Sequence, residues 1–186
     1  MRVIAGKWKS KILNSPKTTK TRPTLDRVKE ALFSMLMPYI QDAIVLDLFS
    51  GTGNLGIEAL SRGAKFAYFN DLNNDAVKVI YSNVQLTNYQ NYAKITKKDY
   101  EKCLKSLESE NVLFDIIFLD PPYEAKVEEK CLGILAKSHL IHEDTIIVLE
   151  SDKEKIFNET IEGLCLVDKR TYGRVMLRMY KREENV

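Results

Sequence analysis

The chain has 186 residues, of which 45% are hydrophobic and 29% are charged, with a net charge of only +2. This composition is ordinary for a soluble globular protein and excludes bulk disorder. No apolar run approaches the roughly 20 residues that a membrane-spanning helix needs, and no apolar stretch follows the basic start as in a signal peptide, so we expect a cytoplasmic protein with no membrane partner.

The first 40 residues predict a short strand or hairpin, a loop and a helix. Residues 3–4 and 12–13 are apolar, and a loop rich in Lys and Thr covers residues 14–22. Apolar residues then recur at intervals of three and four between Val28 and Leu36, the pattern of an amphipathic helix. Thr24 is a candidate N-cap, and Pro38 is expected to end the helix.

From residue 44 onward the pattern alternates between strands and helices. Short apolar runs predict strands at residues 44–49, 66–69, 92–96, 114–119 and 145–149, and amphipathic segments between them predict helices. Such alternation is typical of a parallel sheet with helices on both faces. Residues 164–172 and 175–180, around Gly173, predict two further strands. The expected fold is therefore α/β, with a mostly parallel seven-stranded sheet and an antiparallel C-terminal strand.

Four of the predicted parallel strands end at or just before an aspartate. These residues are Asp47, Asp71, Asp99 and Asp120, and each is separated from the next by one strand–helix unit. Ligands of open parallel sheets bind beyond the carboxyl ends of the strands. The four carboxylates should therefore line one edge of the sheet, which suits a ligand with hydroxyls and an amine better than a phosphate.

The first predicted strand leads into a glycine-rich loop that begins at Gly51. Its pattern, G-x-G-x-x-G, is a weak signal that dinucleotide-binding proteins share. Asp47 lies just before the loop, where it would repel a pyrophosphate and suit the ammonium of an amino acid. Asp71 is placed to accept hydrogen bonds from ribose hydroxyls, and Asp99 suits the amine of adenine. An amino acid, ribose and adenine together indicate S-adenosylmethionine.

The fourth strand ends in Asp120-Pro121-Pro122-Tyr123, the most specific motif in the chain. An exocyclic amine on a nucleobase is a poor nucleophile because its lone pair is delocalised into the ring. Accepting its hydrogens on the Asp120 carboxylate and the Pro121 carbonyl would orient that lone pair toward a methyl donor. Tyr123 is placed to stack on the base.

Positive charge is concentrated at the two ends of the chain. Residues 1–30 carry a net charge of +7 and residues 169–182 a net charge of +6, so the remainder must carry −11. Clustered basic residues often form a surface that binds polyanions. Two solvated basic tails would give the same pattern.

These motifs resemble the class I S-adenosylmethionine-dependent methyltransferases. Residues 47–53 are similar to their first motif, and residues 120–123 to the catalytic motif of the branch that methylates amines. The chain also resembles the bacterial 16S ribosomal RNA guanine-N2 methyltransferase family at residues 2–6, 21–33, 55–64 and 172–173. One departure is Asn70-Asp71, where family members often have Glu.

The resemblance implies a Rossmann-like methyltransferase domain at residues 41–186 and a basic hairpin-and-helix extension at residues 1–40. It implies methylation of one guanine N2 amine on an assembled or assembling small subunit, by a protein that we expect to be monomeric. The expected catalytic residues are Asp120, Pro121, Pro122 and Tyr123, and no metal site is expected. The expected cofactor contacts are Asp47, Phe49, Gly51, Gly53, Asp71, Asp99 and Asp120. The expected RNA contacts are Arg2, Lys7, Trp8, Lys9, Lys11, Arg22 and Arg27.

Other functions share parts of this pattern. An adenine-N6 methyltransferase acting on DNA or RNA would use the same catalytic tetrapeptide, but the chain has little room for a DNA-recognition domain. A glutamine methyltransferase fits the basic ends poorly. A nicotinamide-dependent oxidoreductase leaves the proline motif unexplained, and a non-enzymatic RNA-binding module leaves the four aspartates unexplained. The odd, widely spaced cysteines indicate small buried residues, and both histidines are expected at the surface.

Overall fold

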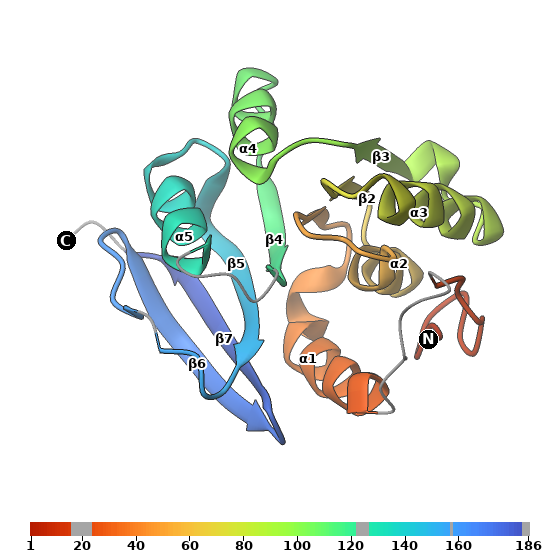
Figure 1. Cartoon of the computed structure of the whole chain (residues 1–186), viewed down its shortest axis with the longest axis horizontal. Helices are drawn as coiled ribbons and strands as arrows, with labels where there is room; N and C mark the ends of the chain where they lie inside the picture. Colours follow the sequence, from red (N-terminus) through yellow and green to blue (C-terminus); the bar gives the residue numbers. More distant parts are fainter. Residues whose placement is uncertain (16–23, 122–126, 157, 184–186) are drawn as a thin grey trace.

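The computed structural model describes residues 1–15, 24–121, 127–156 and 158–183 (Figure 1). Its helices are α1 (Thr24–Ile40), α2 (Asn54–Ser61), α3 (Asn74–Leu86), a 3-10 turn η1 (Gln90–Tyr92), α4 (Tyr100–Ser109) and α5 (Val127–Lys137). Its strands are β1 (Ile44–Asp47), β2 (Phe66–Asn70), β3 (Ala93–Thr96), β4 (Phe114–Leu119), β5 (Ile141–Asp152), β6 (Leu164–Tyr172) and β7 (Val175–Arg182).

The seven strands form one sheet in the order β3-β2-β1-β4-β5-β7-β6. Neighbouring strands from β3 to β5 are parallel, whereas β7 runs antiparallel to both β5 and β6. The predicted fold class is thus confirmed. The register pairs Asp47 with Phe118, and Leu119 with Leu149. The carboxyl ends of β1, β4 and the buried part of β5 therefore lie next to one another.

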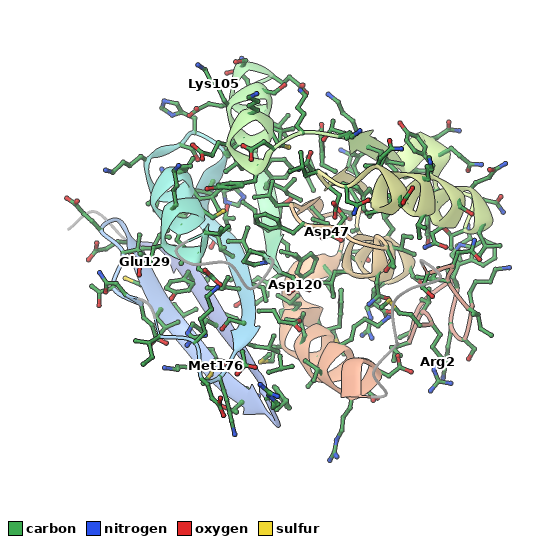
Figure 2. The ribbon with its side chains drawn as sticks, in the orientation of Figure 1. Arg2, Asp47, Lys105, Asp120, Glu129 and Met176 are labelled. Carbon is green, nitrogen blue, oxygen red and sulfur yellow. The ribbon has the colours of Figure 1, made fainter. Side chains whose placement is uncertain are left out.

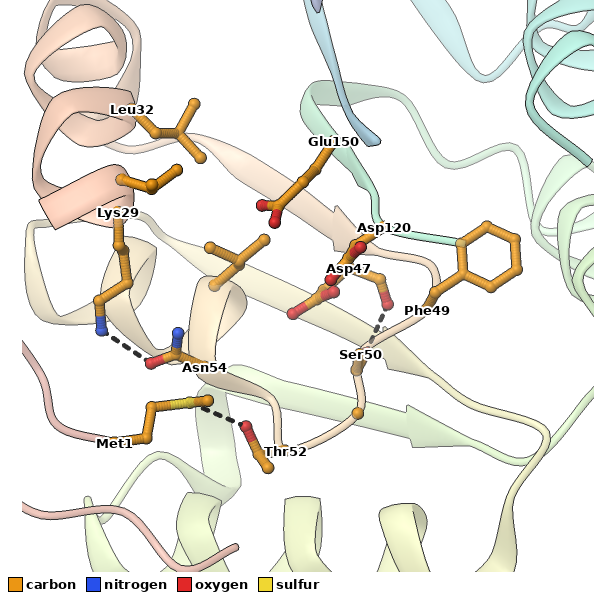
Figure 3. Close-up of a pocket in the computed structure, with 13 residues that line it drawn as sticks. Met1, Lys29, Leu32, Asp47, Phe49, Ser50, Thr52, Asn54, Asp120 and Glu150 are labelled. Carbon is orange, nitrogen blue, oxygen red and sulfur yellow. Dashed lines mark hydrogen bonds between the residues drawn. The ribbon is translucent and has the colours of Figure 1, made fainter. Parts of the chain in front are cut away.

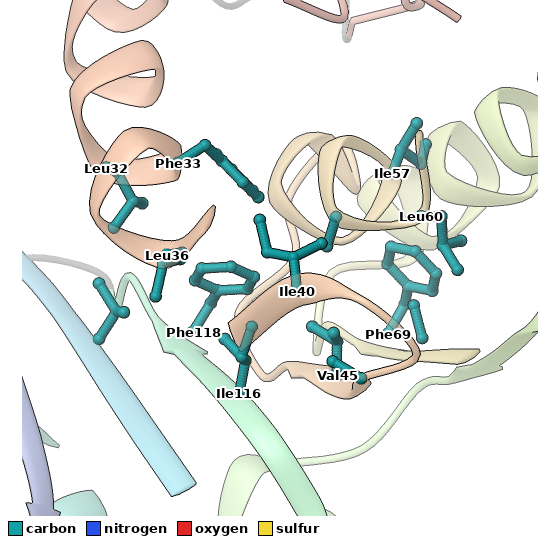
Figure 4. Close-up of a cluster of buried hydrophobic side chains, with 14 of the residues drawn as sticks. Leu32, Phe33, Leu36, Ile40, Val45, Ile57, Leu60, Phe69, Ile116 and Phe118 are labelled. Atoms are coloured by element: carbon teal, nitrogen blue, oxygen red, sulfur yellow. The ribbon is translucent and has the colours of Figure 1, made fainter. Parts of the chain in front are cut away.

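Helices cover both faces of the sheet because the parallel strands are apolar on both sides. On one face, α1, α2 and α3 pack on the strands through Phe33, Leu36, Ile57 and other buried residues (Figure 4). On the other face, α4 and α5 pack through Leu104 and Leu132 and their neighbours. None of the helices in the described part of the chain is long and apolar enough to span a bilayer.

The N-terminal segment packs against the α1 face of the sheet. An antiparallel bridge joins Arg2 to Ile12, as the hairpin prediction required, and Val3 and Leu13 are buried in the same cluster as β1. The helix α1 extends to Ile40, so the expectation that Pro38 ends it is wrong. Proline is tolerated there because it removes only one hydrogen bond, in the last turn of the helix.

The cysteine expectation is confirmed at two positions and wrong at the third. Cys103 and Cys131 are buried beneath α4 and α5, but Cys165 is exposed. Cys165 lies on β6, the edge strand of the sheet, where most residues face solvent on both sides. Of the histidines, His139 is exposed, and His142 is half-buried with its Nε2 3.1 Å from Asp115 Oδ1.

Candidate active site

The four strand-end aspartates lie along one edge of the sheet, as predicted. Asp47 ends β1, Asp71 directly follows β2, Asp99 follows β3 and Asp120 directly follows β4. Because β3, β2, β1 and β4 are consecutive and parallel in the sheet, their carboxyl ends open on the same side. This is the place where open α/β sheets bind ligands.

The loop between β1 and α2 exposes backbone to this edge. Gly51 and Gly53 have φ angles of +55° and +76°, a region that favours glycine, and an added Cβ at Gly51 would meet no atom within 4 Å. At Gly56, by contrast, a Cβ would lie 2.3 Å from the Phe69 ring. The first glycine therefore leaves space for a ligand, while the third lets α2 pack on the sheet.

A cavity of about 220 Å³ lies between this loop, α1 and the ends of β4 and β5 (Figure 3). Three carboxyl groups line it, those of Asp47, Asp120 and Glu150. The predicted residues Phe49 and Gly51 also line it. Its other lining residues are Met1, Val28, Lys29, Leu32, Ser50, Thr52, Asn54 and Leu55.

The three carboxyl groups are all harder to ionise than usual. Burial raises the pKa of Asp47 to about 7, against a hydrogen bond from the Gly56 N–H, and the charges of Asp120 and Asp71 raise it further. Desolvation also raises the pKa of Glu150 to about 8, helped by the charge of Asp120. Asp120 opens onto the cavity, yet the surrounding protein atoms raise its pKa to about 6. In their ionised form these carboxyl groups favour a positively charged ligand.

The Lys29 ammonium group lines the same cavity, but protein acceptors already bind it. Lys29 is 3% exposed, and its Nζ donates to the Arg2 carbonyl at 2.5 Å and to Asn54 Oδ1 at 2.7 Å. It also forms an ion pair of 2.9 Å with Glu58 Oε2. Desolvation lowers the pKa of Lys29 despite this partner. The Lys29 ammonium therefore uses its hydrogen bonds to join α1 to the N-terminal segment and to α2.

Glu58 is the centre of that network. It is fully buried on α2, and its two oxygens accept hydrogen bonds from the backbone N–H groups of Ile4 and Ala5 at 2.8 and 3.0 Å. Arg62 directly follows α2 and lies four residues after Glu58, with its Nε 2.8 Å from Glu58 Oε1. Every formal charge of this buried group therefore has an opposite charge beside it.

Three predicted cofactor residues, Gly53, Asp71 and Asp99, do not line the cavity, and the two aspartates have structural partners. Asp71 accepts hydrogen bonds from the N–H groups of Gly51 and Asn73, each at 2.8 Å. Asp99 caps α4 by accepting from the Glu101 N–H at 3.0 Å. A carboxylate can accept further hydrogen bonds, so both remain available to a ligand along the β2 and β3 ends.

The predicted RNA-binding residues differ in how free they are. Lys7, Lys9 and Arg27 are exposed and have no charged partner within the described residues. Arg2, labelled in Figure 2, pairs with Asp26 at 3.0 Å. Trp8 is half-buried against the core, so the expectation of a free stacking ring is wrong.

Lys11 covers that ring instead, with its Nζ 5.6 Å from the ring centroid. Arg22, Pro122 and Tyr123 lie outside the described residues.

The basic C-terminal region is more neutral than its composition suggests. Lys169 and Arg178 both pair with Glu159. Within the described residues, two further ion pairs join Arg170 to Asp168 and Arg174 to Asp152.

Sequence reasoning missed Glu150. It directly follows the apolar run 145–149 of a predicted parallel strand, so the rule that located the four aspartates would also have found it. Lys29 was missed because its partners come from segments distant in sequence.

Comparisons with known proteins agree with this geometry. The sequence profile of the family described as "conserved hypothetical protein 95" matches residues 1–181. The chain is 35% identical to "Ribosomal RNA small subunit methyltransferase D" of Haemophilus influenzae over 97% of this chain and 93% of that protein. A solved candidate methyltransferase from Escherichia coli matches 98% of both chains at 29% identity, with a TM-score of 0.84.

A more distant candidate methyltransferase, SMU.776 complexed with SAH, shares the fold. The match has a TM-score of 0.68 at 16% identity and covers 91% of this chain and 52% of that one.

Proposed function

The chain belongs to the conserved hypothetical protein 95 family, and we propose that it is a 16S ribosomal RNA methyltransferase of the small subunit. In this proposal it transfers a methyl group from S-adenosylmethionine to the exocyclic N2 amine of one guanine. The observation that carries the proposal is the cavity at the strand ends, where a glycine-rich loop and Asp120 meet. The name of the Haemophilus influenzae relative supports the same RNA class.

The residues that line the cavity fit S-adenosylmethionine. That cofactor carries a sulfonium and an ammonium, and when bound it supplies an electrophilic methyl group. Asp47, Asp120 and Glu150 turn carboxyl groups toward the cavity, and in their ionised form these groups attract a cation. Desolvation raises their pKa values, so a bound cation would favour their ionisation. Gly51 leaves its backbone open to the ligand. Asp71 and Asp99, further along the sheet edge, are proposed to hold the ribose and the adenine.

Asp120 and Pro121 are proposed to hold the acceptor amine. An amine hydrogen bonded to the Asp120 carboxylate, and a second bonded to the Pro121 carbonyl, turn the nitrogen lone pair toward the methyl donor. Forming the carbon–nitrogen bond breaks the carbon–sulfur bond and leaves the amine with one proton too many. The Asp120 carboxylate, already hydrogen-bonded to that amine, is the group placed to receive it. Catalysis is then mainly positioning and electrostatic stabilisation.

Residues 1–40 are proposed to contact the RNA, and residues 41–186 to form the methyltransferase domain. Lys7, Lys9 and Arg27 are free to meet phosphates, and Arg22, Pro122 and Tyr123 take the roles implied by the family motif. The protein is proposed to act as a cytoplasmic monomer on the small subunit or on its assembly intermediate.

The test uses purified protein, tritiated S-adenosylmethionine and small subunits that lack the modification, with free 16S RNA and DNA in parallel. The RNA is digested to nucleosides and the labelled nucleoside identified. We expect label in N2-methylguanosine, reduced roughly 10²- to 10³-fold in Asp120→Ala. Asp144→Ala, an exposed aspartate at the start of the buried part of β5, is the matched control and should label normally.

Label in N6-methyladenosine would overturn the guanine assignment while leaving the mechanism. Absence of label on every substrate would overturn the proposed function.

A further inference from the structure

Among the described carboxyl groups that line the cavity, Glu150 is the one that the proposed reaction does not yet use. The register between β4 and β5 pairs Leu119 with Leu149, so the residues that follow them, Asp120 and Glu150, are neighbours at the sheet edge. In Figure 3 the Glu150 side chain points into the cavity that Asp47 and Asp120 also line. The side chain is half-buried, and within the described residues it makes no hydrogen bond and no ion pair.

Glu150 and Asp120 also line a second cavity. Beside the cavity of about 220 Å³ lies a smaller one of about 30 Å³, and among the described residues only these two line both. The smaller cavity includes Pro121, the proposed second acceptor for the amine. Its remaining lining residues are Glu128, Ser151, Asp152, Lys155, Arg174 and Val175. Glu150 therefore lies on the side of Asp120 from which the acceptor base would meet Pro121.

Two neighbouring carboxylates form a pair of hydrogen-bond acceptors, which requires a ligand with two neighbouring donors. The Watson–Crick edge of guanine has this pattern, because its N1–H lies next to its N2 amine. Adenine and cytosine each present a ring nitrogen that accepts hydrogen bonds beside their exocyclic amine. Such a ring nitrogen would face the second carboxylate with no hydrogen between the two atoms. Both are hydrogen-bond acceptors, so neither would be satisfied and binding would be weakened.

We propose that Glu150 reads the identity of the acceptor base by accepting the N1–H of guanine, while Asp120 holds the neighbouring N2 amine. This inference rests on the proposed function and adds to it the residue that selects guanine. Only the carboxylate form of Glu150 accepts this hydrogen without also offering a donor. Because desolvation and the neighbouring charge of Asp120 raise the pKa of Glu150 to about 8, the preference for guanine should grow as the pH rises through that value, and base preference is compared above it.

The test replaces the target guanine with 2-aminopurine, which keeps the N2 amine in place but turns N1 into an acceptor. The base is introduced by splinted ligation at the nucleotide mapped in the labelling experiment, and subunits are reconstituted from this RNA. We compare the wild type with Glu150→Gln, because a carboxamide can present either a donor or an acceptor to N1. Glu154→Gln, an exposed carboxyl outside both cavities, is the matched control.

The wild type should prefer guanine over 2-aminopurine by roughly 10- to 100-fold in kcat/KM, the discrimination expected of one base-edge hydrogen-bond pattern. In Glu150→Gln this preference should fall to within a few-fold, and Glu154→Gln should keep it in full. The fluorescence of 2-aminopurine gives a second readout that does not depend on turnover. Fluorescence titration should show tighter binding of the 2-aminopurine subunit to Glu150→Gln than to the wild type.

Three results would overturn the inference. Glu150→Gln could keep the full preference for guanine. It could lose activity on both bases equally, which would mean a purely structural role. It could weaken S-adenosylmethionine binding and leave base preference intact, which would assign Glu150 to the cofactor. Failure of the wild type to label guanine subunits would instead contradict the proposed function.

Discussion

The molecule contains two sites with acidic side chains, one around Glu58 and one at the cavity, that differ in how the charge of these side chains is balanced. Glu58 on α2 is fully buried and binds Lys29, Arg62 and two backbone N–H groups. In the cavity, Asp47 accepts one backbone hydrogen bond on its side chain, from Gly56, and Glu150 accepts none within the described residues. Protein groups supply the hydrogen-bond and ion-pair partners of Glu58, whereas the cavity carboxyl groups have few partners among the described residues.

This difference indicates that the Glu58 group stabilises the fold, whereas the cavity carboxyl groups serve ligand binding. A buried charge is expensive unless it is paired and hydrogen-bonded, and around Glu58 the protein supplies the partners that join its N-terminal segment to α1 and α2. In the cavity it leaves three carboxyl groups near one another. Desolvation raises the pKa values of all three, and neighbouring carboxylates raise those of Asp47 and Glu150 further. Ionisable groups that line a cavity and have strongly shifted pKa values are candidates for ligand binding.

The largest expected effect comes from breaking the balanced group. Lys29→Met leaves Glu58 buried without its lysine, and removal of one partner from a buried ion pair typically costs about 3–5 kcal/mol. We expect the midpoint of thermal unfolding to fall by on the order of 10 °C, measured by circular dichroism.

The double variant Lys29→Met/Glu58→Gln should recover part of this loss, because the charge that lost its lysine is then gone. An unchanged midpoint in Lys29→Met would show that the ion pair does not support the fold.

A smaller effect is expected when pH changes the charge of the cavity. Asp47 and Glu150 have pKa values of about 7 and about 8, and the carboxylate form is the one that attracts a cation. The affinity for S-adenosylmethionine should therefore rise with pH, by about tenfold between pH 6 and pH 8, in isothermal titration calorimetry.

S-adenosylhomocysteine lacks the sulfonium charge and is the matched ligand, so its affinity should change less over the same range. Equal pH dependence for the two ligands would show that the carboxylates do not respond to the sulfonium.

Much of this arrangement could be predicted from the sequence, because it follows from the order of strands and helices. Parallel strands separated by helices bring their carboxyl ends together, which located Asp47 and Asp120. What could not be predicted depends on contacts between distant segments. The burial of Trp8 and the pairing of Lys29 with Glu58 arise when the N-terminal segment packs on α2. Similarly, Arg178 is neutralised by an acid from the segment before β6.

The smallest effect is expected for the salt dependence of RNA binding when unpaired basic surface residues are replaced. Paired basic residues serve as the comparison. Lys7 and Lys9 have no charged partner within the described residues, whereas Lys169 and Arg170 pair with acids. Each phosphate contact adds roughly 0.7–0.9 to the slope of log affinity against log salt. Lys7→Ala/Lys9→Ala should therefore lower the slope for binding unmodified subunits by up to twice that amount.

The matched variant Lys169→Ala/Arg170→Ala should change the slope little. A larger change for the C-terminal pair would place the RNA surface at β6 and β7 instead of at the N-terminal segment.

The most direct test of the central claim measures thermal unfolding and methyl transfer in Asp120→Asn and Glu58→Gln side by side. The cavity carboxyls are held for the ligand, so Asp120→Asn should keep or raise the unfolding midpoint while methyl transfer to subunits falls roughly 10²- to 10³-fold. Glu58→Gln should lower the midpoint. If Asp120→Asn unfolds as early as Glu58→Gln, or transfers methyl groups at the normal rate, the assignment of the cavity carboxyls to function is contradicted.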